Sequence, residues 1–287
     1  FELSEDLGVP VMIRLVTRLS HSRAAVARKA ADTPKVRSKG KNADWILVPL
    51  NARRRNRHII GLQESFRRRS ETSPFNKLVL RGNIGIIAAG IAHNYVCEVL
   101  GKSQVYSVLK IGAYPTPSHM VRKLVEHCDD ILIVEDGYPI VESRIHGLLG
   151  VYGKMIRGRM TGALPPDGEL NADLIRAALG ISPQVPRIIA DPIPARLPTL
   201  CQGCPHCDSF QMIVDAVDSM PGAYLFGDIG CYTLGMNPPY GSLHTCVDMG
   251  ASIGMALGAA KAGAHPVICT IGDSTFTHSG MPGLLAA

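Results

Sequence analysis

One stretch near the end of the chain, Val267 to Met281, constrains the fold more than any other because it changes abruptly from an apolar run to a glycine turn. Residues 267–271 are apolar and mostly β-branched, which is typical of a buried parallel strand. Gly272-Asp273-Ser274 follows, and a helix is expected after it. Ligands of open α/β sheets bind at the carboxyl ends of strands, where a glycine lets the backbone approach them closely. The stretch therefore predicts an α/β fold with a ligand site at this turn.

The carboxylate of Asp273 suits a metal-bridged phosphate. Mg²⁺ typically takes one or two protein carboxylates and completes its octahedron with phosphate oxygens and water. An ordinary strand-to-loop turn is the alternative for the tripeptide alone.

The preceding segment favours the ligand site. Gly250, Gly254 and Gly258 recur every four residues and so lie on one face of a helix. Each glycine lowers helix stability relative to alanine, which a helix tolerates where its bare face must touch another backbone or a cofactor. A membrane span is not expected, because Asp248 and Lys261 interrupt the apolar run and the run is too short.

Met249-Gly250, the small-residue helix and Gly272-Asp273-Ser274 together resemble the pyrophosphate domain of thiamine-diphosphate enzymes. In that family the turn is usually Gly-Asp-Gly, so Ser274 departs from the pattern, and the Asn that completes the metal motif would lie past Ala287. The sequence of residues 272–281 resembles that of the alpha subunit of indolepyruvate:ferredoxin oxidoreductase, one of the 2-oxoacid:ferredoxin oxidoreductases. The expectation is an internal fragment of such a subunit.

The resemblance implies an α/β thiamine-diphosphate-binding fold, with parallel sheets and helices on both faces, plus a transketolase C-terminal-like α/β domain. The expected parts are the end of a pyrimidine-binding domain (1–30), a basic linker (31–78), the transketolase C-terminal-like domain (79–180) and a truncated pyrophosphate-binding domain (181–287).

Apolar runs and glycines place the secondary structure. Strands are expected at 10–17, 83–90, 105–111, 131–134 and 223–226, and helices at 4–7, 91–100, 118–128 and from Asp208 onward. This alternation indicates βαβ crossovers and a parallel sheet. Gly85 and Gly90 lack the spacing of a dinucleotide fingerprint, so a structural domain is favoured there. The proline-rich residues 153–196 are expected to form a connection.

The formal charge of +6 is local. Seven arginines against one glutamate in residues 51–70 account for all of it. A single basic linker with Phe66 as its one aromatic residue gives no stacking platform, so nucleic-acid binding is not expected. The sequence shows no signal peptide or membrane span. Its eight cysteines suit a reducing compartment, and we predict a cytoplasmic protein.

Cys201-x-x-Cys204-x-x-Cys207 copies the first three positions of a bacterial ferredoxin run, but Gln211 stands where the fourth Cys belongs. A zinc site that adds His206 is an alternative. By resemblance, the turn instead lines the cofactor pocket and leads into a helix.

Gly227 to Tyr232 forms a second glycine turn after a strand, and we expect it to converge with the turn at 272–274 on one ligand. His244, between the two turns in sequence, and Cys204, just before a helix, are predicted as catalytic residues. The predicted cofactor-binding residues are Cys201, Gly203, Cys204, His206, Gly227, Asp228, Gly230, Cys231, Met249, Gly250, Gly272, Asp273 and Ser274, with Asp273 also the metal ligand.

The resemblance further implies oxidative decarboxylation of an aryl 2-oxoacid to an acyl-CoA with thiamine diphosphate and Mg²⁺. Electrons would pass through iron–sulfur clusters, whose ligands lie outside this sequence, to ferredoxin. The implied partners are a smaller beta subunit, ferredoxin, coenzyme A and the 2-oxoacid. Two alternatives stay open: a non-oxidative thiamine-diphosphate enzyme of the decarboxylase or acetolactate synthase kind, and a non-enzymatic metal-binding module built on the three cysteines.

Overall fold

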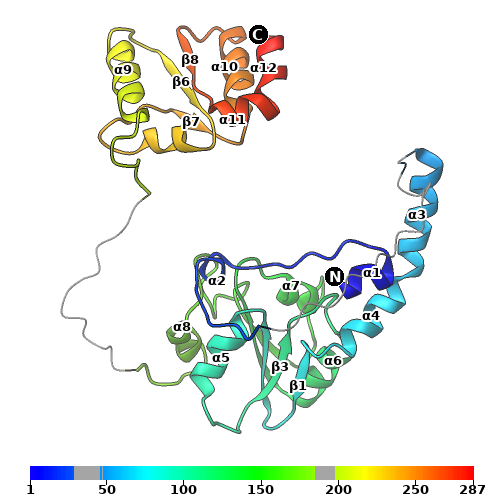
Figure 1. Cartoon of the computed structure of the whole chain (residues 1–287). Helices are drawn as coiled ribbons and strands as arrows, with labels where there is room; N and C mark the ends of the chain where they lie inside the picture. Colours follow the sequence, from blue (N-terminus) through cyan, green and yellow to red (C-terminus); the bar gives the residue numbers. More distant parts are fainter. Residues whose placement is uncertain (29–45, 47, 185–197) are drawn as a thin grey trace. The chain divides into compact units, whose positions relative to one another are not determined.

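The structure is a computed structural model that describes residues 1–28, 46, 48–184 and 198–287. It divides into two compact units, Phe1–Arg187 and Ile188–Ala287 (Figure 1). Each unit is built around its own sheet of mainly parallel strands. The predicted α/β class with parallel sheets is confirmed.

The first unit is built on a five-stranded sheet of order β1-β3-β2-β4-β5. Its strands are β1 (Lys77–Val79), β2 (Ile84–Ala89), β3 (Ser107–Ile111), β4 (Asp130–Glu135) and β5 (Met155–Arg157). All neighbouring pairs are parallel except β1 and β3. The sequence analysis expected β2, β3 and β4 close to these bounds, because each is an uninterrupted apolar run between glycine or polar residues.

Helices cover both faces of this sheet. Side chains alternate along a strand, so Ile86 and Ala88 of β2 pack on the face of α5 (Ala92–Leu100) and α8 (Ala172–Ala178). Ile87 points to the opposite face, where α6 (Ser118–His127) and α7 (Ile140–His146) lie. Because both faces are covered, the central strands are apolar at nearly every position.

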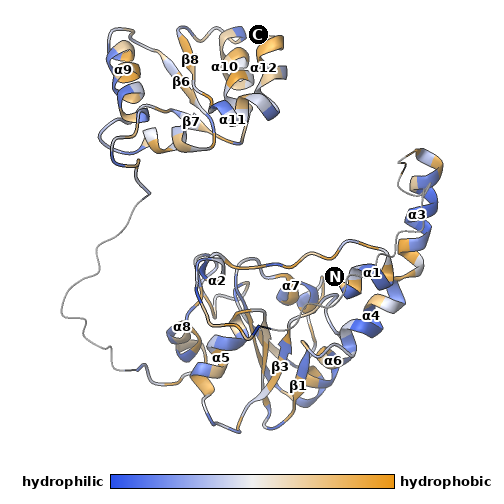
Figure 2. Cartoon of the chain, viewed as in Figure 1, coloured by the Kyte–Doolittle hydropathy of each residue, from blue (hydrophilic) through white to orange (hydrophobic). Residues whose placement is uncertain are grey.

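The basic segment differs from the prediction. It was expected to be an irregular connection, yet it contains α3 (Pro49–Gly61) and α4 (Gln63–Glu71), which carry mostly hydrophilic residues (Figure 2). Arginine and glutamine favour helix formation even where no apolar period marks a helix, and Pro49 stands at the first helical position, which it tolerates.

The connection expected at 153–196 is also wrong in part, because β5 and α8 lie within it. β5 is only three residues long and α8 only seven, so neither shows a clear period in the sequence. Asn171 caps α8, its side chain accepting a hydrogen bond from the amide of Leu174 at 3.0 Å.

At the start of the chain, the helix α1 (Glu2–Leu7) ends at Gly8 in the left-handed conformation (φ 63°), as expected. The strand expected at 10–17 is absent: residues 10–16 form no ladder with any described strand, and α2 (Thr17–Ser20) follows. A strand needs a neighbour for its backbone hydrogen bonds, and no described strand lies beside this segment.

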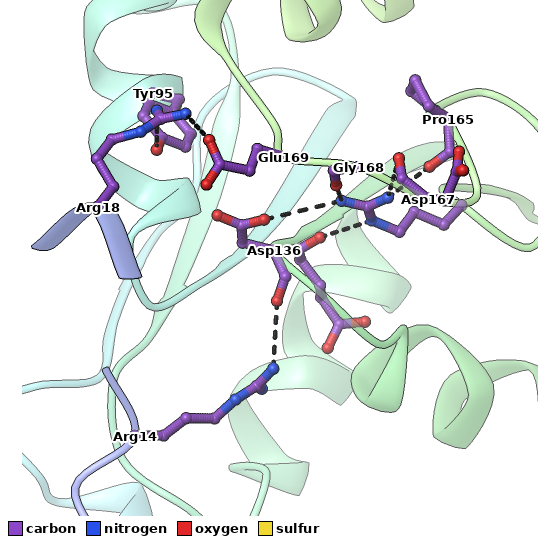
Figure 3. A network of polar contacts seen from close by, with 10 residues as sticks. Arg14, Arg18, Tyr95, Asp136, Pro165, Asp167, Gly168 and Glu169 are labelled. Carbon is purple, nitrogen blue, oxygen red and sulfur yellow. Dashed lines mark hydrogen bonds and ion pairs between the residues drawn. The ribbon is translucent and has the colours of Figure 1, made fainter. Parts of the chain in front are cut away.

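Polar contacts tie this segment to the first unit (Figure 3). Arg18 donates to the hydroxyl of Tyr95 at 2.6 Å and pairs with Glu169, while Arg14 donates to the carbonyl of Asp136 at 3.4 Å. Asp136 directly follows β4, so the contact of Arg14 lies at the carboxyl end of that strand.

The second unit holds the shorter parallel sheet β7-β6-β8. Its elements are α9 (His206–Asp218), β6 (Tyr224–Gly227), the 3₁₀ helix η2 (Cys231–Met236), β7 (Thr245–Cys246), α10 (Ala251–Lys261), β8 (Val267–Cys269), α11 (Asp273–Thr275), the π-helix η3 (Phe276–Gly280) and α12 (Met281–Ala286). The helix expected from Asp208 onward, the strand at 223–226, the small-residue helix, the strand from Val267 and the turn after it are all present, as α9, β6, α10, β8 and the turn at α11. Within the described parts of the chain, no helix has the length and apolar character needed to cross a bilayer.

Candidate cofactor site

The second unit contains a cavity of about 230 Å³ where the turns after β6 and β8 meet. Both strands run parallel, so their carboxyl ends lie at the same edge of the sheet. The cavity is lined by His206, Ile229, Gly230, Cys231, Tyr232, Met249, Gly272, Asp273, Ser274 and Thr275. The two glycine turns singled out in the sequence therefore do converge, and seven of the predicted site residues line this cavity.

Asp273 offers its carboxylate at the cavity wall. Its side chain is exposed, and Oδ1 accepts a hydrogen bond from the amide of the next residue, Ser274, at 2.7 Å. This contact uses one carboxylate oxygen, and Oδ2 accepts no hydrogen bond from the described residues. A Cβ placed on Gly272 would meet nothing within 4 Å, so the space next to the turn is open. A hard oxygen ligand beside open space is what a Mg²⁺-bridged diphosphate requires.

Ser274 departs from the usual Gly-Asp-Gly turn, and the structure shows no special task for its side chain, which is exposed. Its backbone amide contacts Asp273, and its carbonyl accepts from the hydroxyl of Thr277 at 2.7 Å. We therefore expect Ser274→Gly to be tolerated, with a change in the free energy of unfolding of about 1 kcal/mol or less. Thermal unfolding would check this, and loss of folding would show that the hydroxyl has a structural role.

The cysteine turn reaches the cavity through His206. The thiol of Cys204 lies 3.2 Å from Nδ1 of His206, and the ring of His206 packs edge-on against Tyr232 with centroids 4.8 Å apart. Cys201 and Gly203 are exposed and do not line the cavity. The structure therefore connects only the end of this turn to the site.

The third cysteine, Cys207, does not line the cavity. A hydrogen bond with Cys207 raises the pKa of the Tyr240 hydroxyl above its ordinary value, and burial raises it further. Within the described residues, no group of three or more His, Cys, Asp or Glu side chains is arranged to hold a metal ion. A Mg²⁺ site with one protein carboxylate does not need such a group.

Asp228 does not line the cavity, although it was predicted to bind the cofactor. Its side chain is fully buried, and both oxygens accept from the amide of Gly250, at 2.8 and 3.0 Å. Gly227 is buried against Leu243, and a Cβ there would lie 2.6 Å from that side chain. Gly227, Asp228 and Gly250 thus stand behind the wall that Ile229 and Met249 present.

His244 also lies apart from the cavity lining. It precedes β7, where its Nδ1 accepts from the amide of Leu225 at 3.1 Å and its ring packs edge-on against Tyr224. Leu225 lies within β6, two residues before the strand's carboxyl end, so the imidazole is held at the sheet rather than at the turns. This geometry does not support the predicted catalytic role.

Three lining residues were missed: Ile229, Tyr232 and Thr275. Ile229 and Tyr232 belong to the Gly-Asp-Ile-Gly-Cys-Tyr run, whose glycines were noticed while its larger side chains were not. Tyr232 also contacts Phe210, with ring centroids 5.6 Å apart, so it joins the wall of the cavity to the buried face of α9.

Burial raises the pKa of the Cys269 thiol at the end of β8, and the Asp228 carboxylate raises it further.

A larger cavity of about 510 Å³ lies in the first unit, beside the loops after β4 and β5. Tyr138, Pro139, Met160 and Pro166 contribute apolar surface, and the guanidinium of Arg159 is already bonded to backbone carbonyls. None of the predicted site residues lies there, so the smaller cavity is the candidate site.

Comparison with known proteins agrees with this placement. The profile of the family "Thiamine pyrophosphate enzyme, C-terminal TPP binding domain" matches residues 228–287, which include most of the cavity lining. A solved 2-oxoglutarate:ferredoxin oxidoreductase from Magnetococcus marinus aligns at 12% identity and a TM-score of 0.28, over 39% of this chain and 20% of that one; an alignment this weak carries no argument.

Longer relatives match the whole chain. Indolepyruvate oxidoreductase subunit IorA of Methanothermobacter thermautotrophicus is 36% identical over 100% of this chain and 49% of its own length. The subunits of the same name from Methanothermobacter marburgensis and Archaeoglobus fulgidus are 33% and 34% identical, again over 100% of this chain and over 49% and 48% of their own lengths. The chain spans about half the length of these curated relatives. Over its whole length, the chain is similar to the indolepyruvate oxidoreductase subunits IorA.

Proposed function

We propose that this chain is part of the thiamine-diphosphate subunit of a 2-oxoacid:ferredoxin oxidoreductase that converts an aryl 2-oxoacid of the indolepyruvate kind to an acyl-CoA. The observation that carries the proposal is the cavity in which the Gly272-Asp273-Ser274 turn meets the Gly230 to Tyr232 turn. The thiamine-pyrophosphate family match over residues 228–287 supports the cofactor. The name shared by the relatives supports the reaction and the substrate class.

The residues present fit a diphosphate bound through Mg²⁺. Asp273 would hold the metal through its free carboxylate oxygen, and Gly272 would let the phosphates approach the backbone. When bound, thiamine diphosphate supplies the carbanion chemistry that cleaves the bond to the substrate carboxylate.

His206, Tyr232 and Met249 contribute further side chains to the wall. His206 is the one lining side chain that can carry a positive charge, so we assign it to the anionic part of the ligand. Cys204 acts on the site only through its contact with His206, and Cys231 lines the cavity directly. We leave His244 out of the catalytic set because its imidazole is held by β6.

The remaining partners belong to the proposal as well. A smaller beta subunit, ferredoxin, coenzyme A and iron–sulfur clusters would complete the reaction. All eight cysteines of this chain are free thiols, which supports a cytoplasmic location.

The test is an assay of the whole protein with its partner subunit. Indolepyruvate and coenzyme A should together drive reduction of ferredoxin, and omission of thiamine diphosphate or Mg²⁺ should abolish the reaction. Release of CO₂ without reduction of an acceptor would instead identify a non-oxidative thiamine-diphosphate enzyme. Stoichiometric zinc without thiamine-diphosphate binding would identify the metal-binding module.

We further predict that Cys201, Cys204 and Cys207 hold no iron–sulfur cluster. A cluster needs convergent thiolates, whereas no three Cys, His, Asp or Glu side chains of the described residues are grouped so that they could hold a metal, and Cys204 contacts His206. Replacing all three with serine should leave iron content and cluster absorbance unchanged, while weakening turnover or thiamine-diphosphate binding. A fall in iron per chain with cofactor binding intact would place a redox site in this turn.

A further inference from the structure

Asp228 directly follows β6, and its carboxylate contacts the backbone at the start of α10. It is 0% exposed, and its oxygens accept from the amides of Gly250 at 2.8 and 3.0 Å and of Ser252 at 3.2 Å. These amides belong to the cap and first turn of an eleven-residue helix. Such amides have no partner within their own helix, and a negative charge at this end is favourable.

The residue at the cap position has no side-chain oxygen that could accept hydrogen bonds from these amides. Gly250 has no side chain, and its φ of 99° is a conformation that other residues rarely adopt. A Cβ there would lie 2.7 Å from the hydroxyl oxygen of Ser279, so a conventional Ser or Asp cap has no room. The capping oxygen is therefore supplied from 22 residues away.

Both segments that Asp228 joins form walls of the cavity. Ile229 and Gly230 follow it directly, and its own carbonyl accepts from the hydroxyl of Thr233 at 3.1 Å, which in turn accepts from the amide of Gly230 at 3.2 Å. On the other side, Gly250 follows Met249, which also lines the cavity.

We propose that Asp228 is a positioning residue of the cofactor site: it binds no ligand, but fixes Met249 and the start of α10 against the Ile229 to Tyr232 wall. This inference rests on the proposed function only for the identity of the ligand. The capping itself is a property of the protein alone.

The experiment uses Asp228→Ala and Asp228→Asn in the whole protein, with two readouts. Amide hydrogen exchange without cofactor should be about 10- to 100-fold faster at Gly250 and Ser252 in the alanine variant, because hydrogen bonds to a charged acceptor are lost. Calorimetry with thiamine diphosphate and Mg²⁺ should show a dissociation constant raised by about tenfold. Asp228→Asn keeps one acceptor oxygen and should recover part of both effects, and it serves as the test if the alanine variant does not fold.

Two matched variants separate positioning from general stability. Leu225→Ala removes a buried side chain of β6 that does not line the cavity, so it should lower the melting temperature but leave the cofactor affinity of the folded protein within about twofold. Asp218→Asn changes an exposed carboxylate at the end of α9 and should leave both readouts unchanged.

Unchanged exchange at Gly250 and Ser252 in both Asp228 variants would overturn the proposal. So would a loss of cofactor affinity no greater than that of Leu225→Ala. A wild-type protein that fails to bind thiamine diphosphate would overturn the proposed function and the link to the cofactor, while the exchange rates would still decide whether Asp228 fixes the start of α10.

Discussion

Replacing Asp273 with alanine should abolish Mg²⁺-dependent binding of thiamine diphosphate while leaving the fold intact. Asp273 supplies the one carboxylate among the residues that line the cavity, and its side chain is exposed, so its loss opens no hole in the core. Loss of a residue that merely orients a metal ligand typically costs about 10- to 100-fold in metal affinity. Loss of the ligand itself should therefore weaken binding by more than about 100-fold, measured by calorimetry with Mg²⁺ present.

Asp248→Ala is the matched control. Asp248 is also exposed and precedes the cavity residue Met249, but it does not line the cavity. Its replacement removes the same charge from the same region and should change the dissociation constant by less than about threefold. If Asp273→Ala bound thiamine diphosphate as tightly as the wild type, Asp273 would not be the metal ligand.

Replacing Arg159 with methionine should destabilise the first unit by about 3–5 kcal/mol. The side chain is 2% exposed, and its guanidinium donates to the carbonyls of Glu135, Pro165, Asp167 and Gly168 at 2.6–3.2 Å. Methionine fills similar volume but donates nothing, so these carbonyls and the nearby carboxylate of Asp136 would lose their partner. Urea unfolding would measure the effect.

Arg122→Met is its control, because Arg122 is exposed on α6. It should change the free energy of unfolding by less than about 0.5 kcal/mol. A loss below about 1 kcal/mol for Arg159→Met would mean that the loop at 165–168 keeps its shape without the guanidinium, and that the buried charge contributes little to the fold.

The network around Arg159 also illustrates what local patterns leave out. Burial raises the pKa of the Glu135 carboxyl, while hydrogen bonds from the amides of Val141 and Glu142 act in the opposite direction. The sequence analysis assigned Glu135 no role. Its carboxylate in fact caps α7, and its carbonyl accepts from Arg159 across 24 residues.

The sequence by itself determined the central strands β2, β3 and β4, the helices between them, and the two glycine turns of the second unit. These features are local: an apolar run, a helical period and a glycine break act within a few residues, so they are visible in one sequence. The similarity to the indolepyruvate oxidoreductase subunits was likewise readable from residues 249–250 and 272–281, which lie close together along the chain.

Only the tertiary structure decided what the side chains at those turns do. Whether Asp228 faces a ligand or the first turn of α10, and whether His244 faces the cavity or β6, depends on which distant backbone groups lie beside them. The prediction of a strand at 10–17 was wrong for the same reason, since a strand exists only where a neighbouring strand completes its hydrogen bonds. Sequence patterns fix the local conformation, whereas packing between segments far apart in the chain fixes which polar groups meet.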